Sequence, residues 1–268
     1  MNTITTTPDT WQAGDAYERY MGRWSRQLTP LFLQWLAVPA GRHWLDVGCG
    51  TGSLCAAILE RAAPASVTGV EPSEGFLATA RATLPPEVVL HQGTAARLPL
   101  PDHTVDVTVS ALVLNFVPDP HAALRDMARV TVPGGDIAAC VWDYAGCMAM
   151  TRLYWDAAAE LGLLAPGQAQ GERFPLCQPD ALAAAFAAAG MAQVEVSGID
   201  ISMRFTSFDD YWQPFLAGQG PAPAHAMRLE APARDSLREL LRRRLPMQPD
   251  GAALLPARAW AARGIVTG

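Results

Sequence analysis

The chain has 268 residues, of which 50% are hydrophobic and 17% charged, enough apolar material for one large domain or two small ones. Its 20 basic and 26 acidic residues give a formal net charge of -6, and a field of that sign repels polyphosphate, which disfavours general binding to nucleic acid. Every basic residue is an arginine. The absence of lysine excludes Walker-type phosphate binding, Schiff-base catalysis, Ser-Lys hydrolases and Tyr-Lys dehydrogenases.

Cysteine usage and the apolar stretches bear on the compartment. The five cysteines include no C-x-x-C pair, so we expect reduced thiols, no disulfide framework and no metal site. Residues 1–12 lack a basic segment followed by an apolar one, which predicts that there is no signal peptide. The longest apolar stretch, 181–192, is too short to span a bilayer. These observations favour a soluble, cytoplasmic protein that is not associated with a membrane.

The first half of the chain alternates short apolar segments with helical ones. Strands are expected over 43–47, 66–70, 88–90, 105–110 and 136–142. Helices are expected over 53–62, 74–83 and 120–130. Such alternation with short connections predicts a parallel sheet with helices on both faces.

The second half of the chain is less regular. Helices are expected over 151–163, 180–189, 208–216 and 233–245, with a loop over 218–224. Extended structure is expected over 193–205 and 252–266. No internal repeat or low-complexity linker divides the chain, which predicts a single domain over 1–268.

A cluster of glycines follows the first predicted strand directly. Residues 45–52 are Leu-Asp-Val-Gly-Cys-Gly-Thr-Gly, and Glu71 stands at the end of the second predicted strand. Glycines let the backbone approach a ligand closely, and an acid at the end of the second strand can accept both hydroxyls of a ribose. Ser53 replaces the third glycine of a G-x-G-x-x-G dinucleotide fingerprint. The pattern predicts a nucleoside-containing cofactor across the strand tips, although a tight turn alone would also use such glycines.

Four phrases, at 45–52, 70–73, 95–102 and 110–117, carry a resemblance to a known family. In this order and at this spacing they resemble the class I S-adenosylmethionine-dependent methyltransferases, most closely their UbiE-like small-molecule branch. The resemblance implies a Rossmann-like α/β fold, with a seven-stranded methyltransferase sheet whose last strand is antiparallel. Helices would cover both faces, with helical insertions forming a cap.

The resemblance also implies a plan for the single domain. An N-terminal helical lid would occupy 11–36 and the cofactor-binding core 37–143. Cap insertions that shape a substrate site would occupy 144–179 and 206–250.

The resemblance implies S-adenosylmethionine as the cofactor. Asp46 would help to hold its cationic amine and Glu71 its ribose hydroxyls, although a helix-facing acid and a solvated strand end are the plainer alternatives. The implied cofactor-binding residues are Tyr20, Asp46, Gly48, Cys49, Gly50, Gly52, Glu71, Pro72, Ser73, Gly93, Thr94, Ala95, Ser110 and Ala111. Relatives usually carry an acid after the third strand that accepts the adenine amino group. Here that stretch is Gly-Thr-Ala, so the acid is missing.

The acceptor would be walled by the segments after the fourth and fifth strands, the N-terminal segment and the cap. The expected substrate residues are Tyr17, Trp24, Asn115, Phe116, Trp142, Tyr144, Tyr211 and Trp212. As a group they suggest an apolar or aromatic acceptor. Each aromatic taken singly is also what a packed core would contain, and the N-terminal segment could be an ordinary core helix.

Candidates for catalytic residues are few. Asp143 ends the fifth predicted strand and is the candidate base, since burial there would raise its pKa. Asn115 stands where relatives often have histidine, and it can orient a hydroxyl or an amine without taking its proton. His121 and His225 are expected on the surface.

The sequence therefore predicts methyl transfer from S-adenosylmethionine to a small, apolar or aromatic acceptor by in-line displacement. The alternative is a protein that keeps the cofactor pocket without methylating. No Asn/Asp-Pro-Pro-Tyr-like or Pro-Cys motif of nucleic-acid methylation is present, and Arg242–Arg244 is expected to be a solvated helix face. The atom that receives the methyl group, the use of a base and the oligomeric state stay open.

Overall fold

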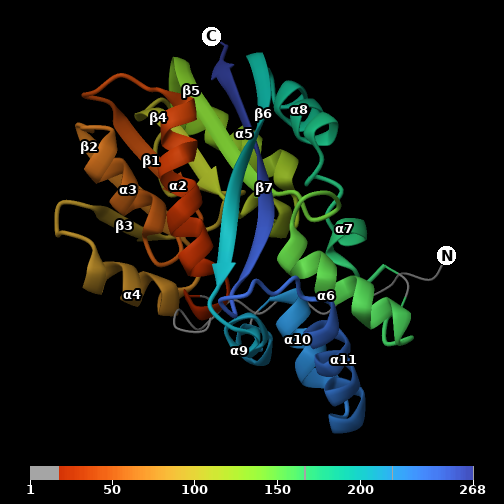
Figure 1. The fold of residues 1–268 in the computed structure, drawn as a ribbon. Helices are drawn as coiled ribbons and strands as arrows, with labels where there is room; N and C mark the ends of the chain where they lie inside the picture. The colour runs from red at the N-terminus through yellow and green to blue at the C-terminus, as the bar shows by residue number, and fades with distance from the viewer. Residues whose placement is uncertain (1–17, 166, 219, 268) are drawn as a thin grey trace.

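The computed structural model describes residues 18–165, 167–218 and 220–267. Its centre is a seven-stranded sheet (Figure 1). In spatial order the strands are β3 (Val89–Gln92), β2 (Ser66–Glu71), β1 (His43–Val47), β4 (Val105–Ala111), β5 (Thr131–Trp142), β7 (Ala253–Val266) and β6 (Met191–Phe205). The first five run parallel, and β7 pairs antiparallel with β5 and β6. The predicted α/β architecture with an antiparallel last strand is confirmed.

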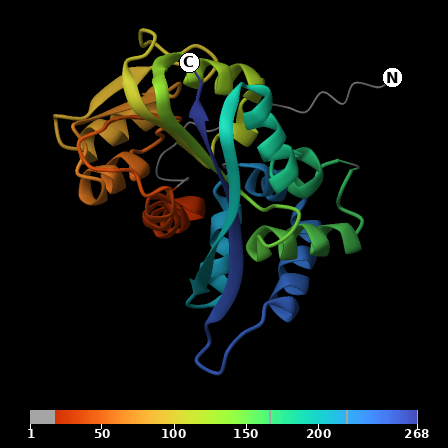
Figure 2. The same ribbon diagram turned by 90° about the horizontal axis from the view of Figure 1, so that it is seen from above.

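Helices cover both faces of this sheet (Figure 2). On one face α2 (Arg23–Leu36), which follows a π-helical turn at Glu18–Gly22, packs against α3 (Ser53–Arg61). On the other, α5 (Pro120–Val130) packs against α8 (Pro179–Ala188). A fifth helix, α4 (Glu74–Thr83), packs against β2 and β3. Apolar side chains between these layers form the core, as parallel strands buried on both faces require.

The remaining helices form a cap at one end of β6 and β7 (Figure 1). They are α6 (Ala149–Glu160), α7 (Gln170–Arg173), α9 (Phe208–Trp212), α10 (Pro221–Arg228) and α11 (Ala231–Arg244). Among them α10 and α11 pack against α6. None of the helices in the described part of the chain is long and apolar enough to cross a bilayer.

The core helices and strands lie within a few residues of their expected positions, whereas several details of the second half differ. The helix expected over 208–216 ends at Trp212 and continues as a 3-10 turn at Gln213–Leu216, since Pro214 has no N–H to donate. Within the expected loop 218–224, α10 begins at Pro221. The helix α7 was not expected, and β5 begins at Thr131 with an irregular register instead of at residue 136.

Candidate functional site

The loop after β1 is shaped by its glycines. Gly48 has a φ of +75°, and its N–H donates to the Val70 carbonyl at 2.7 Å. A Cβ atom added to Gly48 would lie 2.6 Å from a methyl carbon of Val113, so no larger residue fits there. Gly50 also has a positive φ, +55°, but a Cβ atom there would meet nothing within 4 Å. The loop is therefore packed against the protein at Gly48 and faces open space at Gly50.

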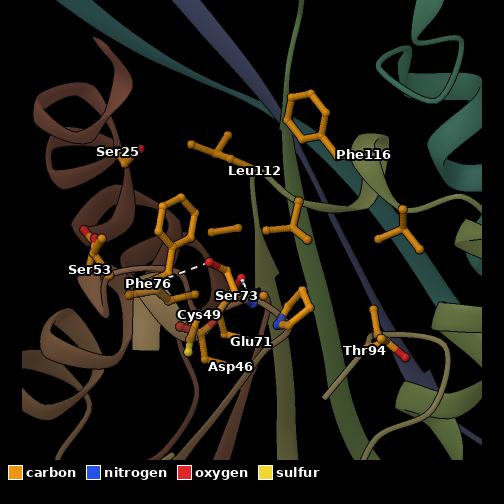
Figure 3. A pocket seen from close by; sticks show the side chains of 18 of the residues that line it. Ser25, Asp46, Cys49, Ser53, Glu71, Ser73, Phe76, Thr94, Leu112 and Phe116 are labelled. Carbon is orange, nitrogen blue, oxygen red and sulfur yellow. Dashed lines mark hydrogen bonds between the residues drawn. The ribbon is translucent and has the colours of Figure 1, made fainter. Parts of the chain in front are cut away.

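Glu71 joins this loop to the beginning of α4. Its carboxylate accepts hydrogen bonds from the N–H of Gly50 at 3.2 Å and from the N–H of Ser73 at 3.0 Å. Glu71 and Ser73 lie side by side in Figure 3. The Ser73 hydroxyl in turn accepts from the N–H of Phe76, as the N-cap of α4. Burial raises the pKa of Glu71 above its usual value, although both N–H groups oppose the shift. A carboxylate has about four acceptor positions, so Glu71 keeps capacity for a ligand.

Asp46 lies at the end of β1 and is completely buried. Its carboxylate accepts a hydrogen bond from the Cys55 thiol at 3.3 Å. Burial, together with the smaller effect of the nearby charge of Glu71, raises the pKa of Asp46 to about 7, although the Cys55 hydrogen bond opposes the shift. A cationic group placed beside Asp46 would restore its ionised form.

These residues share one cavity of about 1100 Å³ above the ends of β1, β2 and β4 (Figure 3). Ten of the residues expected from the sequence to bind cofactor or acceptor line it: Asp46, Gly48, Cys49, Glu71, Pro72, Ser73, Thr94, Ala95, Ala111 and Phe116. Single ligands usually occupy cavities of about 300–1,000 Å³. The cavity therefore has room for two ligands side by side.

Five expected cofactor residues are not among the described residues that line the cavity: Tyr20, Gly50, Gly52, Gly93 and Ser110. The Ser110 hydroxyl donates to the Val47 carbonyl at 2.8 Å, which ties β4 to β1. The ring of Tyr20 packs edge-on against Phe215, with the centroids 5.8 Å apart. These two side chains are therefore placed as packing residues.

Sequence reasoning missed several lining residues, among them Ser25, Thr29, Phe76, Leu112 and Val113. Ser25 and Thr29 are four residues apart on α2, so they share one helix face, and only this spacing could have indicated them. Leu112 has a φ of +64°, which turns the chain sharply after β4. A leucine in the left-handed region is uncommon and has no sequence signal.

The two ends of the cavity differ in chemistry. Leu112 and Phe116 lie toward one end in Figure 3, whereas Asp46, Cys49 and Glu71 lie toward the other. The charged side chains in the described lining are Asp46, Glu71, Glu74 and Asp119, and no arginine or histidine is among them. An acidic lining favours neutral or cationic ligand groups over anionic ones.

Most of the expected substrate aromatics are buried in the packing. Trp24 packs edge-on against Phe205 at 5.1 Å, and the Tyr211 hydroxyl donates to the Met150 carbonyl at 3.0 Å. Five of them are buried without lining the cavity in the described structure: Trp24, Trp142, Tyr144, Tyr211 and Trp212. Their burial supports the alternative that these aromatic side chains belong to the packed core. Tyr17 lies outside the described residues.

Asp143 is not positioned as the sequence suggested. Its two carboxylate oxygens accept from the N–H groups of Gly146 and Cys147, both at 2.8 Å. The side chain is buried and absent from the described lining of the cavity. It holds the turn after β5, so the structure gives no support to a role as base.

Asn115, His121 and His225 differ in burial and in hydrogen bonding. The amide nitrogen of Asn115 is buried and makes no hydrogen bond, and the residue is not in the described lining. His121 is exposed, as expected. His225 is not on the surface: it is buried in α10, where its Nδ1 accepts from the Tyr154 hydroxyl at 2.7 Å and its Nε2 bonds to the Leu163 carbonyl. Burial lowers the pKa of His225.

Comparison with known proteins adds a family and a fold. Residues 45–139 match a family model described as a methyltransferase domain. An uncharacterised methyltransferase of Mycobacterium tuberculosis is 41% identical over 128 residues, which cover 48% of this chain and 49% of that protein. A demethylmenaquinone methyltransferase of Bacillus licheniformis is 35% identical over 108 residues, which cover 39% and 47%. The chain thus spans about half the length of these curated relatives.

Solved structures share the fold over most of the chain. A putative methyltransferase of Bacillus halodurans superposes with a TM-score of 0.61 at 14% identity, over 90% of this chain and 99% of that one. A phosphoethanolamine N-methyltransferase of Haemonchus contortus, solved with S-adenosylhomocysteine, gives a TM-score of 0.57 at 14% identity, over 95% and 57%. At these identities the likeness concerns the fold alone.

Proposed function

We propose that this chain, whose residues 45–139 match the methyltransferase domain family, transfers a methyl group from S-adenosylmethionine to a small, uncharged or cationic, apolar acceptor. One observation carries the proposal. The glycine loop after β1, Asp46 and Glu71 meet in a single cavity whose other end is lined by Leu112 and Phe116.

The residues present fit the cofactor. Asp46 is buried with a raised pKa, so a cationic amine beside it would be stabilised by the ionised carboxylate. Glu71 would accept the ribose hydroxyls with its remaining acceptor positions. Gly50 leaves open space where a Cβ atom would otherwise stand. Pro72, Phe76, Thr94 and Ala95 would border the adenine.

The reaction needs little from the protein beyond placement. When bound, the cofactor would supply an electrophilic methyl carbon: its carbon–sulfur bond would break as a lone pair of the acceptor bonds to the carbon, leaving S-adenosylhomocysteine, and an O–H or N–H acceptor would release its proton to solvent. The chain would contribute an apolar surface at Leu112 and Phe116 that orients the acceptor. Proximity of this kind reaches effective molarities of ~10⁵ M or more. With Asp143 engaged in a turn, we propose catalysis by proximity, with no dedicated base.

The acidic lining defines the acceptor further. Every charged side chain in the described lining is a carboxylate, and Glu74 and Asp119 remain besides the two that would hold the cofactor. Phosphate and carboxylate groups are therefore disfavoured in the acceptor, and nucleic acid is not proposed as a substrate. The cytoplasm is the proposed compartment, because the five cysteines are free thiols.

Incubation with S-adenosylmethionine and a panel of phenols, amines and carboxylates tests the proposal. We expect S-adenosylhomocysteine to form with apolar phenols or amines and not with matched carboxylates. The Glu71→Gln variant should bind the cofactor more weakly by about 1–3 kcal/mol in titration calorimetry, because it loses charge-assisted hydrogen bonds. Tight cofactor binding without S-adenosylhomocysteine for any acceptor would favour the non-methylating alternative.

A further inference from the structure

An aromatic contact joins the cap to the apolar end of the cavity. Phe116 lines the cavity from the 3-10 turn Leu114–Phe116 that follows β4. Its ring packs edge-on against Phe174, with the centroids 5.1 Å apart. Phe174 is buried and is not among the described residues that line the cavity. Phe174 therefore contacts Phe116 without itself lining the cavity in the described structure.

Phe174 is itself held in place by the cap. Tyr144, just after β5, contacts its ring at 5.6 Å, and the Arg173 guanidinium lies 5.0 Å from the ring centre. The Phe174 N–H donates to the Gln170 carbonyl at 3.2 Å.

The helix α7, which ends one residue before Phe174, is anchored in turn. The side-chain carbonyl of Gln170 accepts from the Trp155 indole of α6 at 2.9 Å. A Cβ atom on Gly171 would lie 3.0 Å from the backbone of Ala145, so α7 sits close against the loop after β5. This arrangement leaves Phe174 little freedom to move.

We infer that Phe174 is a positioning residue that fixes the ring of Phe116 and thereby sets the size of acceptor the cavity admits. The inference rests on the proposed function, since it concerns the acceptor end of the same cavity. A ring in edge-on contact loses its preferred orientation when its partner is shortened. Replacing Phe174 by a smaller side chain would let Phe116 turn away from the cavity, and longer acceptors would then fit.

Binding of para-alkylphenols, from para-methylphenol to para-octylphenol, to the protein saturated with S-adenosylhomocysteine tests this inference by calorimetry. In Phe174→Leu we expect the affinity ratio of the long to the short phenols to rise about 10-fold, the size of effect that one methylene group has in an apolar pocket. Phe116→Leu should raise the same ratio, and adding Phe174→Leu to it should change the ratio no further. Phe174→Tyr keeps the ring and should keep the wild-type ratio.

Phe208→Leu is the matched control. Phe208 is a cap phenylalanine of similar burial, 6% exposed against 7% for Phe174, and its ring contacts Tyr211 and the Arg242 guanidinium. The Phe208→Leu variant should lose about as much stability as Phe174→Leu, and its affinity ratio of long to short phenols should stay at the wild-type value. An unchanged ratio in Phe174→Leu, or an equal shift in Phe208→Leu, would overturn the inference. Should Phe174→Leu not fold, Phe174→Met serves the same comparison.

The binding readout separates this inference from the proposed function. A shifted ratio without any S-adenosylhomocysteine formed from S-adenosylmethionine would contradict methyl transfer and support the positioning role. A wild-type protein that binds none of the phenols would overturn the positioning role, whatever the outcome of the activity assay with amines.

Discussion

Asp46 should make the protein less stable as the pH rises, and its replacement should remove this dependence. The Asp46 carboxyl is completely buried, with a pKa raised from 3.8 to about 7. The unfolded chain loses this proton near pH 3.8, whereas the folded protein keeps it until about pH 7. Across that window the folded state binds more protons than the unfolded state, so the free energy of unfolding falls as the pH rises.

The pKa difference sets the magnitude of the effect. Each unit corresponds to about 1.4 kcal/mol, so the roughly three-unit shift costs up to about 4 kcal/mol, and the full cost is present above pH 7. At pH 5 the cost is smaller, because the pH then lies about two units below the pKa of the folded state. Between pH 5 and pH 8 the Asp46→Asn variant should therefore gain about 2.7 kcal/mol of stability relative to the wild type.

Urea unfolding at pH 5, 6, 7 and 8 without cofactor measures this difference. The loss of the Cys55 hydrogen bond changes the free energy of unfolding of the variant by the same amount at every pH. The pH dependence of the stability difference between variant and wild type is therefore the quantity that reports on Asp46. Asp180→Asn, at an exposed aspartate of α8, is the control and should run parallel to the wild type. A pH-independent difference between Asp46→Asn and the wild type would refute the argument from burial.

Two further predictions follow from the glycine loop and from the N-terminal helix. Gly48→Ala should lower the free energy of unfolding more than Gly50→Ala does. Both substitutions add about 1–2 kcal/mol of backbone strain at a positive φ, but only the Cβ atom at residue 48 would also clash with Val113, at a cost of about 1–3 kcal/mol; equal losses of stability in urea unfolding would contradict this distinction. Residues 20–36 should exchange their amide hydrogens slowly even without cofactor, because Trp24, Leu28 and Phe32 are buried in the core. A large gain of protection on adding S-adenosylmethionine would instead support the interpretation of this segment as a lid.

The sequence alone determined the cofactor half of the protein. Strand and helix periods recur regularly from residue 43 to 142, and the glycine loop and Glu71 depend on local chain geometry. A parallel sheet brings its carboxyl ends to one edge, so motifs that follow successive strands meet in space without further information. For this reason Asp46, Glu71 and Ser73 were predicted together and lie together.

The acceptor half was decided by tertiary contacts. Trp24, Trp142 and Tyr211 have the same chemistry whether they face a ligand or a core, and only the packing of α2, β5 and the cap places them inside. Asp143 lies outside the described lining of the cavity, and two backbone N–H groups of the following turn donate to its oxygens, a contact that no residue pattern indicates. His225 is buried because α10 starts at Pro221 and packs on α6, which turns an expected loop histidine toward Tyr154. Local periodicity determines whether a segment forms a helix or a strand. Long-range packing determines which of its side chains meet a ligand, because burial depends on neighbours that are distant in the chain.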